Sequence, residues 1–142
     1  MEGCSLCEKI EKSDFNNLIM ENEHAMVIAI DELREGQCLI FTKNHRKSIS
    51  EIDMDEYNSI SEIIIKVSKA LEKKYNCEKT YLLCISDMVE HIHFHLVPKH
   101  KDKCSMGAYC FGKLFETEGK RETPDSELNT LAKEIRELIE TA

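Results

Sequence analysis

The sequence predicts an α+β domain with an antiparallel sheet of about five strands, one long central helix and a C-terminal helix. The main observation is the order of the periodic segments: three β-favouring runs precede a long amphipathic pattern, two follow it, and a helical pattern ends the chain. Strands and helices grouped in this way favour an antiparallel sheet with helices packed on it. A second observation is that 142 residues with 42% hydrophobic content, and with no repeat or linker, suffice for one core. We therefore expect a single domain over residues 1–142.

The first three strands are expected between residues 18 and 41. Residues 18–20 and 25–30 predict a hairpin, because a polar turn at residues 21–23 separates two apolar, β-favouring runs. Gly36 then precedes a third short run, residues 38–41, which we expect to extend the same sheet.

The clearest helix is predicted after Asp53. Asp53 and Glu56 have the spacing of a capping pair, in which each side chain bonds the backbone of the other residue. Apolar residues then recur at steps of three and four, which predicts a helix that covers one face of the sheet. This stripe consists of Tyr57, Ile60, Ile64, Val67 and Leu71.

The second half of the chain predicts two further strands and one more helix. The strands are expected over residues 81–85 and 91–97. Thr123 and Pro124 have the character of a cap and a first helical position, so a C-terminal helix is expected over about residues 124–141. Its apolar face consists of Leu128, Leu131, Ile135, Leu138 and Ile139.

Composition excludes several classes of protein. A formal charge of −8 disfavours binding to nucleic acid polymers and to anionic membranes, because like charges repel. No apolar run approaches the roughly 20 residues that span a bilayer, and the N-terminus lacks the pattern of a signal peptide, so we expect a cytoplasmic protein. Seven cysteines without a secretory signal predict reduced thiols rather than a disulfide framework. Residues 91–103 are a local exception to the acidic charge, with four histidines and three lysines, and favour a compact anion such as phosphate.

The most informative segment is His91-Ile92-His93-Phe94-His95-Leu96-Val97. Side chains alternate across a strand, so the three imidazoles are expected on one face and the apolar residues on the other. Packing three polar rings together in a core would leave ring nitrogens unpaired, at about 1–3 kcal/mol for each group. Two chemical uses remain open at this point. The three histidines could hold a catalytic metal, or a neutral imidazole could attack phosphorus directly.

This segment resembles the histidine-triad motif, in which three histidines alternate with apolar residues, at all seven positions. Residues 36–45, Gly-Gln-Cys-Leu-Ile-Phe-Thr-Lys-Asn-His, are similar to a second segment of the same family, and the resemblance covers about residues 4–99. It implies a nucleotide hydrolase or transferase that acts on a small-molecule nucleotide. Adenine nucleotides such as a dinucleoside polyphosphate or a nucleoside phosphoramidate are the expected substrates. It also implies a homodimer.

The resemblance implies separate roles for the three histidines. His93, the middle one, is the expected nucleophile, which attacks the α-phosphorus and forms a covalent nucleotidyl-histidine that water then cleaves. Its second ring nitrogen is expected to donate to the backbone carbonyl of His91. His95 is expected near the phosphate oxygens or the leaving group, where it stabilises developing charge.

Some members of the family carry a structural zinc, and the matching ligands here are Cys4, Cys7, His45 and His91. A Cys2His2 set is a closed tetrahedral site, so this zinc would brace the active site without an open position for chemistry.

The nucleotide-binding residues implied by the resemblance are Asp31 for the ribose hydroxyls, Ser86 for the phosphate oxygens, and Lys99 together with His95. Asp87 departs from the family pattern, because an ionised carboxylate would repel a phosphate. Gln37 likewise replaces a histidine that is often found after the glycine.

Two alternative hypotheses stay open. Because of Asp87, the protein could be a catalytically weak nucleotide-binding or scaffold protein. It could also be a metal-dependent hydrolase centred on all three histidines.

Overall fold

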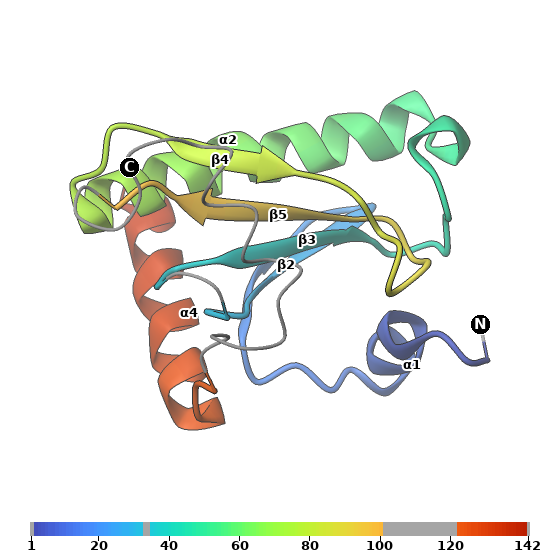
Figure 1. Ribbon diagram of the computed structural model, residues 1–142, viewed down its shortest axis with the longest axis horizontal. Helices are drawn as coiled ribbons and strands as arrows, with labels where there is room; N and C mark the ends of the chain where they lie inside the picture. Colours follow the sequence, from blue (N-terminus) through green and yellow to red (C-terminus); the bar gives the residue numbers. More distant parts are fainter. Residues whose placement is uncertain (1, 33–34, 101–121, 142) are drawn as a thin grey trace.

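The computed structural model describes residues 2–32, 35–100 and 122–141. Its centre is an antiparallel sheet of five strands in the order β1-β2-β3-β5-β4 (Figure 1). The strands are β1 (Leu18–Glu21), β2 (Ala25–Ala29), β3 (Cys38–Thr42), β4 (Thr80–Leu83) and β5 (His93–Pro98). The helices are α1 (Ser5–Lys12), the short 3-10 helix η1 (Ile49–Glu51), α2 (Met54–Tyr75) and α4 (Asp125–Glu140). The predicted fold class is therefore confirmed.

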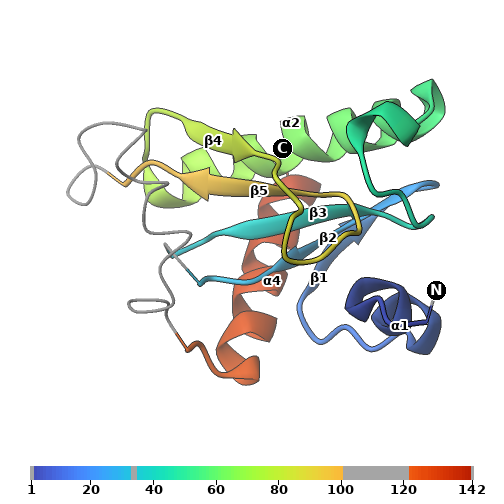
Figure 2. The same ribbon diagram turned by 45° about the vertical axis from the view of Figure 1, so that its right-hand side comes forward.

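The two faces of the sheet have different cover. Val27, Ile40 and Phe94 point into the main core beneath α2 and α4. Their neighbours along the strands, including Met26 and Phe41, point the other way and pack with residues of α1. Figure 2 shows α1 well separated from α2 and α4, on the opposite side of the sheet. The histidines therefore share their face of the sheet with α1.

Helix α2 begins with the predicted capping box: Asp53 accepts from the Glu56 amide, and Glu56 accepts from the Asp53 amide. The predicted stripe is wrong at its first position, since Tyr57 is 48% exposed. Glu56 takes the buried position in that turn, because its carboxylate serves the cap and also accepts from the Arg46 guanidinium at 3.0 Å. Ile63, which was not predicted in the stripe, is fully buried.

Helix α4 packs on α2 and on the sheet through Leu131, Ala132 and Ile135, which belong to the main core. The predicted cap is wrong, because the N-cap residue is Pro124 and it makes no side-chain cap bond. The Thr123 hydroxyl donates instead to the Asp31 carboxylate at 3.0 Å, so it is not used to cap the helix.

Strand β5 begins at His93, two residues later than predicted. The backbone amide of Ile92 donates to the carbonyl of Arg46 at 2.7 Å, outside the regular pairing of β5 with β3. His91 thus lies before the strand rather than on it, which separates it from the other two histidines.

Helix α1 was not predicted from the sequence. It has eight residues, and Leu6 and Cys7 are the ones it buries. Such a short helix depends on packing for its stability. Within the described ranges, no helix is both long enough and apolar enough to cross a bilayer.

Candidate active site and metal centre

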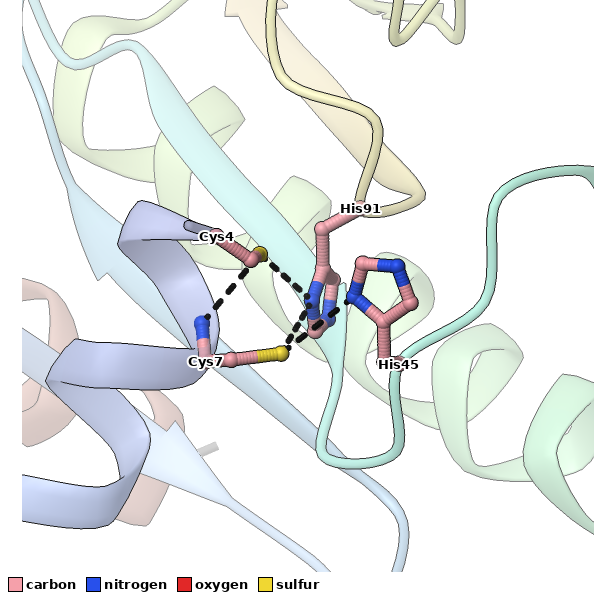
Figure 3. Close-up of side chains that lie close together, drawn as sticks. All are labelled: Cys4, Cys7, His45 and His91. Atoms are coloured by element: carbon pink, nitrogen blue, oxygen red, sulfur yellow. Dashed lines mark hydrogen bonds between the residues drawn. The ribbon is translucent and has the colours of Figure 1, made fainter. Parts of the chain in front are cut away.

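Four side chains from three separate segments meet at the start of α1. Cys4 and Cys7 come from this helix and its cap, His45 follows β3, and His91 precedes β5 (Figure 3). The Cys7 sulfur lies 3.3 Å from Nδ1 of His45 and 3.3 Å from Nδ1 of His91, and the Cys4 sulfur lies 3.5 Å from Nδ1 of His91. All four potential ligand atoms lie within 4.8 Å of one another. The structure thus brings together the complete set of predicted metal ligands.

The ring of His91 is held in the form that binds a metal. Its Nε2 lies 2.6 Å from the backbone carbonyl of Thr42, and a carbonyl oxygen can only accept, so Nε2 carries the proton. Nδ1 then keeps its lone pair, which is directed at the two sulfur atoms. Hydrogen bonds of this kind orient metal-binding histidines in known sites.

The chemistry of the cluster fits zinc. A zinc ion at about 2.3 Å from sulfur and about 2.0 Å from nitrogen separates tetrahedral ligands by about 3.5 Å, which matches the observed spacings. Burial raises the pKa of the Cys7 thiol and lowers the pKa of His91, so the ring stays neutral and the thiol needs a nearby cation to ionise. Nε2 of His45 is buried and has no hydrogen-bond partner among the described residues.

His93 opens strand β5 opposite Phe41 of β3. Its Nδ1 lies 2.8 Å from the carbonyl of His91, so by the same argument Nδ1 carries the proton and Nε2 keeps the lone pair. Nε2 makes no hydrogen bond to a described residue, and it is not fully buried. The residue is 9% exposed, so this lone pair faces outward from a largely enclosed ring.

His95 lies beside His93, with ring centroids 5.2 Å apart and the rings nearly perpendicular. Its Nδ1 is 3.1 Å from the side-chain nitrogen of Gln37, a residue that is fully buried. In the part of the chain that the structure describes, one group of at least three potential ligands occurs, and neither His93 nor His95 belongs to it. The hypothesis of a metal held by all three histidines therefore finds no support in the geometry.

The side chain of Ser86 contacts the backbone of His93, the predicted nucleophile. Its hydroxyl accepts from the His93 amide at 3.1 Å and lies 3.3 Å from the His93 carbonyl, to which it donates. Ser86 has a left-handed backbone conformation, with φ of +62°. Asp87, the next residue, lines a cleft of about 490 Å³ together with Cys4, His45 and the start of the chain. Asp87 is therefore placed beside the metal cluster.

The other predicted nucleotide-binding residues already have partners. The Asp31 carboxylate, which is 3% exposed, accepts from the Gly36 amide at 2.9 Å and from the Thr123 hydroxyl. The Lys99 ammonium pairs with Glu78, which raises the lysine pKa. Both assignments remain predictions.

Sequence reasoning missed two contributors to the site. The backbone carbonyl of Thr42 orients His91, and Gln37 contacts His95. Every residue has a backbone carbonyl, so the sequence does not indicate which carbonyl orients a histidine. Gln37 immediately precedes β3, whose Leu39 opposes His95, so its contact with His95 depends on the pairing of two strands that are remote in the chain.

Comparison with known proteins identifies the family of this chain. The model of the HIT domain matches residues 11–102, which is more than half of the chain. The chain belongs to the HIT family. The adenosine 5'-monophosphoramidase of Schizosaccharomyces pombe is 27% identical over 109 residues, which cover 74% of this HIT protein and 80% of the relative.

Solved HIT structures show the same fold. A Zn-bound histidine triad family protein from Mycobacterium smegmatis superposes with a TM-score of 0.72 at 15% identity, covering 98% of this chain and 94% of that one. Diadenosine triphosphate hydrolase from Plasmodium falciparum, in complex with Cyclomarin A, has a TM-score of 0.69 at 14% identity, covering 90% and 79% of the two chains.

Proposed function

We propose that this HIT protein is an enzyme that hydrolyses or transfers nucleotides at the α-phosphorus, with His93 as the nucleophile. Its substrate is a nucleoside phosphoramidate, a dinucleoside polyphosphate or a related adenylated compound. The observation that carries the proposal is the 2.8 Å contact between Nδ1 of His93 and the carbonyl of His91, which leaves the lone pair on the outward Nε2. Two relatives, an adenosine 5'-monophosphoramidase and a diadenosine triphosphate hydrolase, support the substrate class.

The reaction proceeds in two displacements. Nε2 of His93 forms a bond to the α-phosphorus while the bond from phosphorus to the leaving nitrogen or oxygen breaks, and the leaving group departs with a proton from solvent. Water then forms a bond to phosphorus and releases a proton to solvent, the bond to Nε2 breaks, and the nucleoside monophosphate is released as His93 regains its neutral form. The carbonyl of His91 holds the proton on Nδ1 and stabilises the positive charge that develops on the ring.

Cys4, Cys7, His45 and His91 are proposed to hold a structural zinc ion. When bound, the ion supplies a cross-link between helix α1 and the segment before β5, with all four positions filled by protein. Because His91 also offers its carbonyl to His93, this cross-link restrains the residue that orients the nucleophile. The Zn-bound histidine triad family protein from Mycobacterium smegmatis, which shares the fold, supports the choice of metal.

The remaining properties follow from the same features. A single domain over residues 1–142 is proposed, which is supported by the main core that α4 shares with α2. A homodimer is proposed because strand β4 lies at an edge of the sheet and Leu82, on that strand, is 49% exposed. Two zinc-binding thiols require reducing conditions, which supports a cytoplasmic location. The charge of −8 makes a small nucleotide, rather than a nucleic acid polymer, the expected partner.

The test is to trap the covalent intermediate. Zinc-loaded protein is mixed with adenosine 5'-phosphoramidate, quenched in acetone to preserve the acid-labile P–N bond, and digested for mass spectrometry. We expect an adenylyl group on His93, and none in the His93→Ala variant. Hydrolysis without any adduct, at a rate that His93→Ala leaves unchanged, would remove His93 from the mechanism. Binding of the nucleotide without turnover would instead favour the hypothesis of a weak enzyme or scaffold.

A further inference from the structure

The polar side chains of Gln37 and His95 contact each other on the side of the sheet that carries His93. The side-chain nitrogen of Gln37 lies 3.1 Å from Nδ1 of His95, and Gln37 is fully buried. We propose that Gln37 is a positioning residue that keeps the proton of neutral His95 on Nε2, so that His95 presents an N–H to the substrate. This inference deepens the proposed function and rests on it for the reaction, although the protonation pattern can be measured without it.

The backbone around Gln37 is held firmly in place. Gly36 has φ of +88°, and a Cβ there would come within 2.4 Å of the Tyr75 ring, so glycine is required at this turn. The carbonyl of Gln37 accepts from the amides of Ile30 and Asp31, each at 3.0 Å. The Gly36 amide in turn donates to the Asp31 carboxylate. These hydrogen bonds fix the backbone position from which the side chain of Gln37 extends.

The sheet then directs this side chain toward His95. Leu39 lies opposite His95 in the pairing of β3 with β5. Gln37 immediately precedes β3, and its side chain reaches Nδ1 of His95 from the start of that strand. Because Gln37 is fully buried, the contact does not depend on an exposed, freely rotating side chain.

The chemistry of the contact assigns the proton. An amide nitrogen donates, so Nδ1 of His95 accepts, and a neutral imidazole that accepts at Nδ1 carries its hydrogen on Nε2. His93 has the reverse arrangement, because the carbonyl of His91 requires a hydrogen on Nδ1. Two neighbouring rings, with centroids 5.2 Å apart, thus offer one lone pair and one N–H.

This pair of opposite tautomers suits a phosphoryl centre. The lone pair of His93 attacks phosphorus, while the N–H of His95 donates a hydrogen bond to a phosphoryl oxygen, and the proton stays on His95. If His95 carried its hydrogen on Nδ1, its Nε2 lone pair would face that oxygen and repel it. A carboxamide does not ionise, so Gln37 itself offers the same N–H to neutral His95 at every pH.

The direct test is nuclear magnetic resonance of zinc-loaded protein labelled with ¹⁵N in its histidines, at a pH where the rings are neutral. Multiple-bond ¹H–¹⁵N spectra distinguish the two tautomers. We expect the hydrogen on Nε2 in His95 and on Nδ1 in His93. In Gln37→Met, which keeps the size of the side chain, His95 should become a mixture of tautomers while His93 is unchanged. A hydrogen on Nδ1 of His95 in the wild type, or the same tautomer in Gln37→Met, would overturn the proposal.

Kinetics connect the tautomer to the reaction. With adenosine 5'-phosphoramidate, we expect Gln37→Met to lower kcat by roughly tenfold with a smaller change in KM, and Gln37→Glu, which places a proton on Nδ1, by roughly 10²-fold. Asn22→Asp makes a matched amide-to-carboxylate change in the β1–β2 turn and should leave kcat unchanged. An unchanged kcat in both Gln37 variants contradicts the role in catalysis. If the wild type shows no turnover, the proposed function fails, whereas the spectra still decide the role of Gln37 in the resting protein.

Discussion

The first two histidines of the triad, His91 and His93, are each oriented by a hydrogen bond to a backbone carbonyl, but through opposite ring nitrogens. At His91, a backbone carbonyl accepts a hydrogen bond from Nε2–H, and the lone pair of Nδ1 faces two buried sulfur atoms. At His93, a backbone carbonyl accepts a hydrogen bond from Nδ1–H, and the lone pair of Nε2 faces outward. The choice of nitrogen, set by one hydrogen bond, thus separates the proposed metal ligand from the proposed nucleophile two residues away.

The difference depends on where the strand begins. His93 is paired with β3 and shares its face with His95, whereas His91 lies in the connection before the strand and turns toward α1. Yet the two regions are joined, because the side chain of His91 belongs to the cluster of two cysteines and two histidines while its carbonyl orients His93. Changes in one region should therefore affect the other weakly and in a defined direction.

The largest expected effect is on catalysis, from His93→Ala. Removing the nucleophile should lower kcat for adenosine 5'-phosphoramidate by at least about 10³-fold. Zinc content, measured by mass spectrometry of the metal, should stay at the wild-type level because His93 is outside the cluster. His24→Ala, a histidine near the β1–β2 turn, is the matched control and should retain full activity. Loss of zinc in His93→Ala would show that the two regions are not separate.

Removing a proposed metal ligand should reduce zinc content and stability strongly and catalysis less. Cys4→Ser should lose most of its zinc and lower the free energy of unfolding by roughly 3 kcal/mol, because the cross-link to α1 is lost. Its kcat should fall only about tenfold, through the weakened support of His91. Cys77→Ser is the control, since Cys77 is a partly exposed thiol outside the cluster. Chemical denaturation and metal analysis check both variants, and a Cys4→Ser protein of wild-type stability would contradict the structural role of the metal.

Ser86→Gly isolates the hydroxyl that bonds the backbone of His93. Glycine accepts the φ of +62° without strain, so the change removes the side chain and preserves the turn. We expect kcat to fall by roughly threefold to tenfold, because the start of β5 loses two hydrogen bonds, with zinc content unchanged. Steady-state kinetics separate this outcome from a rise in KM alone, which would instead indicate a direct contact of Ser86 with the substrate.

The smallest effect is expected at Lys99. Its ammonium already pairs with Glu78 at the edge of the sheet, so Lys99→Ala should raise KM by less than about threefold and leave zinc content unchanged. Glu78→Ala frees the same lysine and serves as the companion variant. A tenfold rise in KM for Lys99→Ala would show that Lys99 leaves this pair to bind the nucleotide.

Local patterns in the chain were sufficient for the elements that depend on neighbours in sequence. The β1–β2 hairpin follows from turn residues, the capping box from the spacing of Asp53 and Glu56, and the C-terminal helix from its apolar periodicity, all of which act over a few positions. The four cluster residues could be named as well, because a resemblance carries ligand identities from one chain to another.

Other features depend on partners that are remote in the chain, and periodicity does not report them. Glu56 displaces Tyr57 from the buried stripe because Arg46 lies beside it, and Thr123 fails as a cap because Asp31 takes its hydroxyl. The late start of β5, and with it the separation of His91 from His93, follows from a bond between Ile92 and the Arg46 carbonyl. The partners of His91 and His95, the Thr42 carbonyl and Gln37, are remote in the chain and meet these rings only once the sheet has formed. For His93 the acceptor is the carbonyl of His91, two residues away, which a residue pattern does not report either.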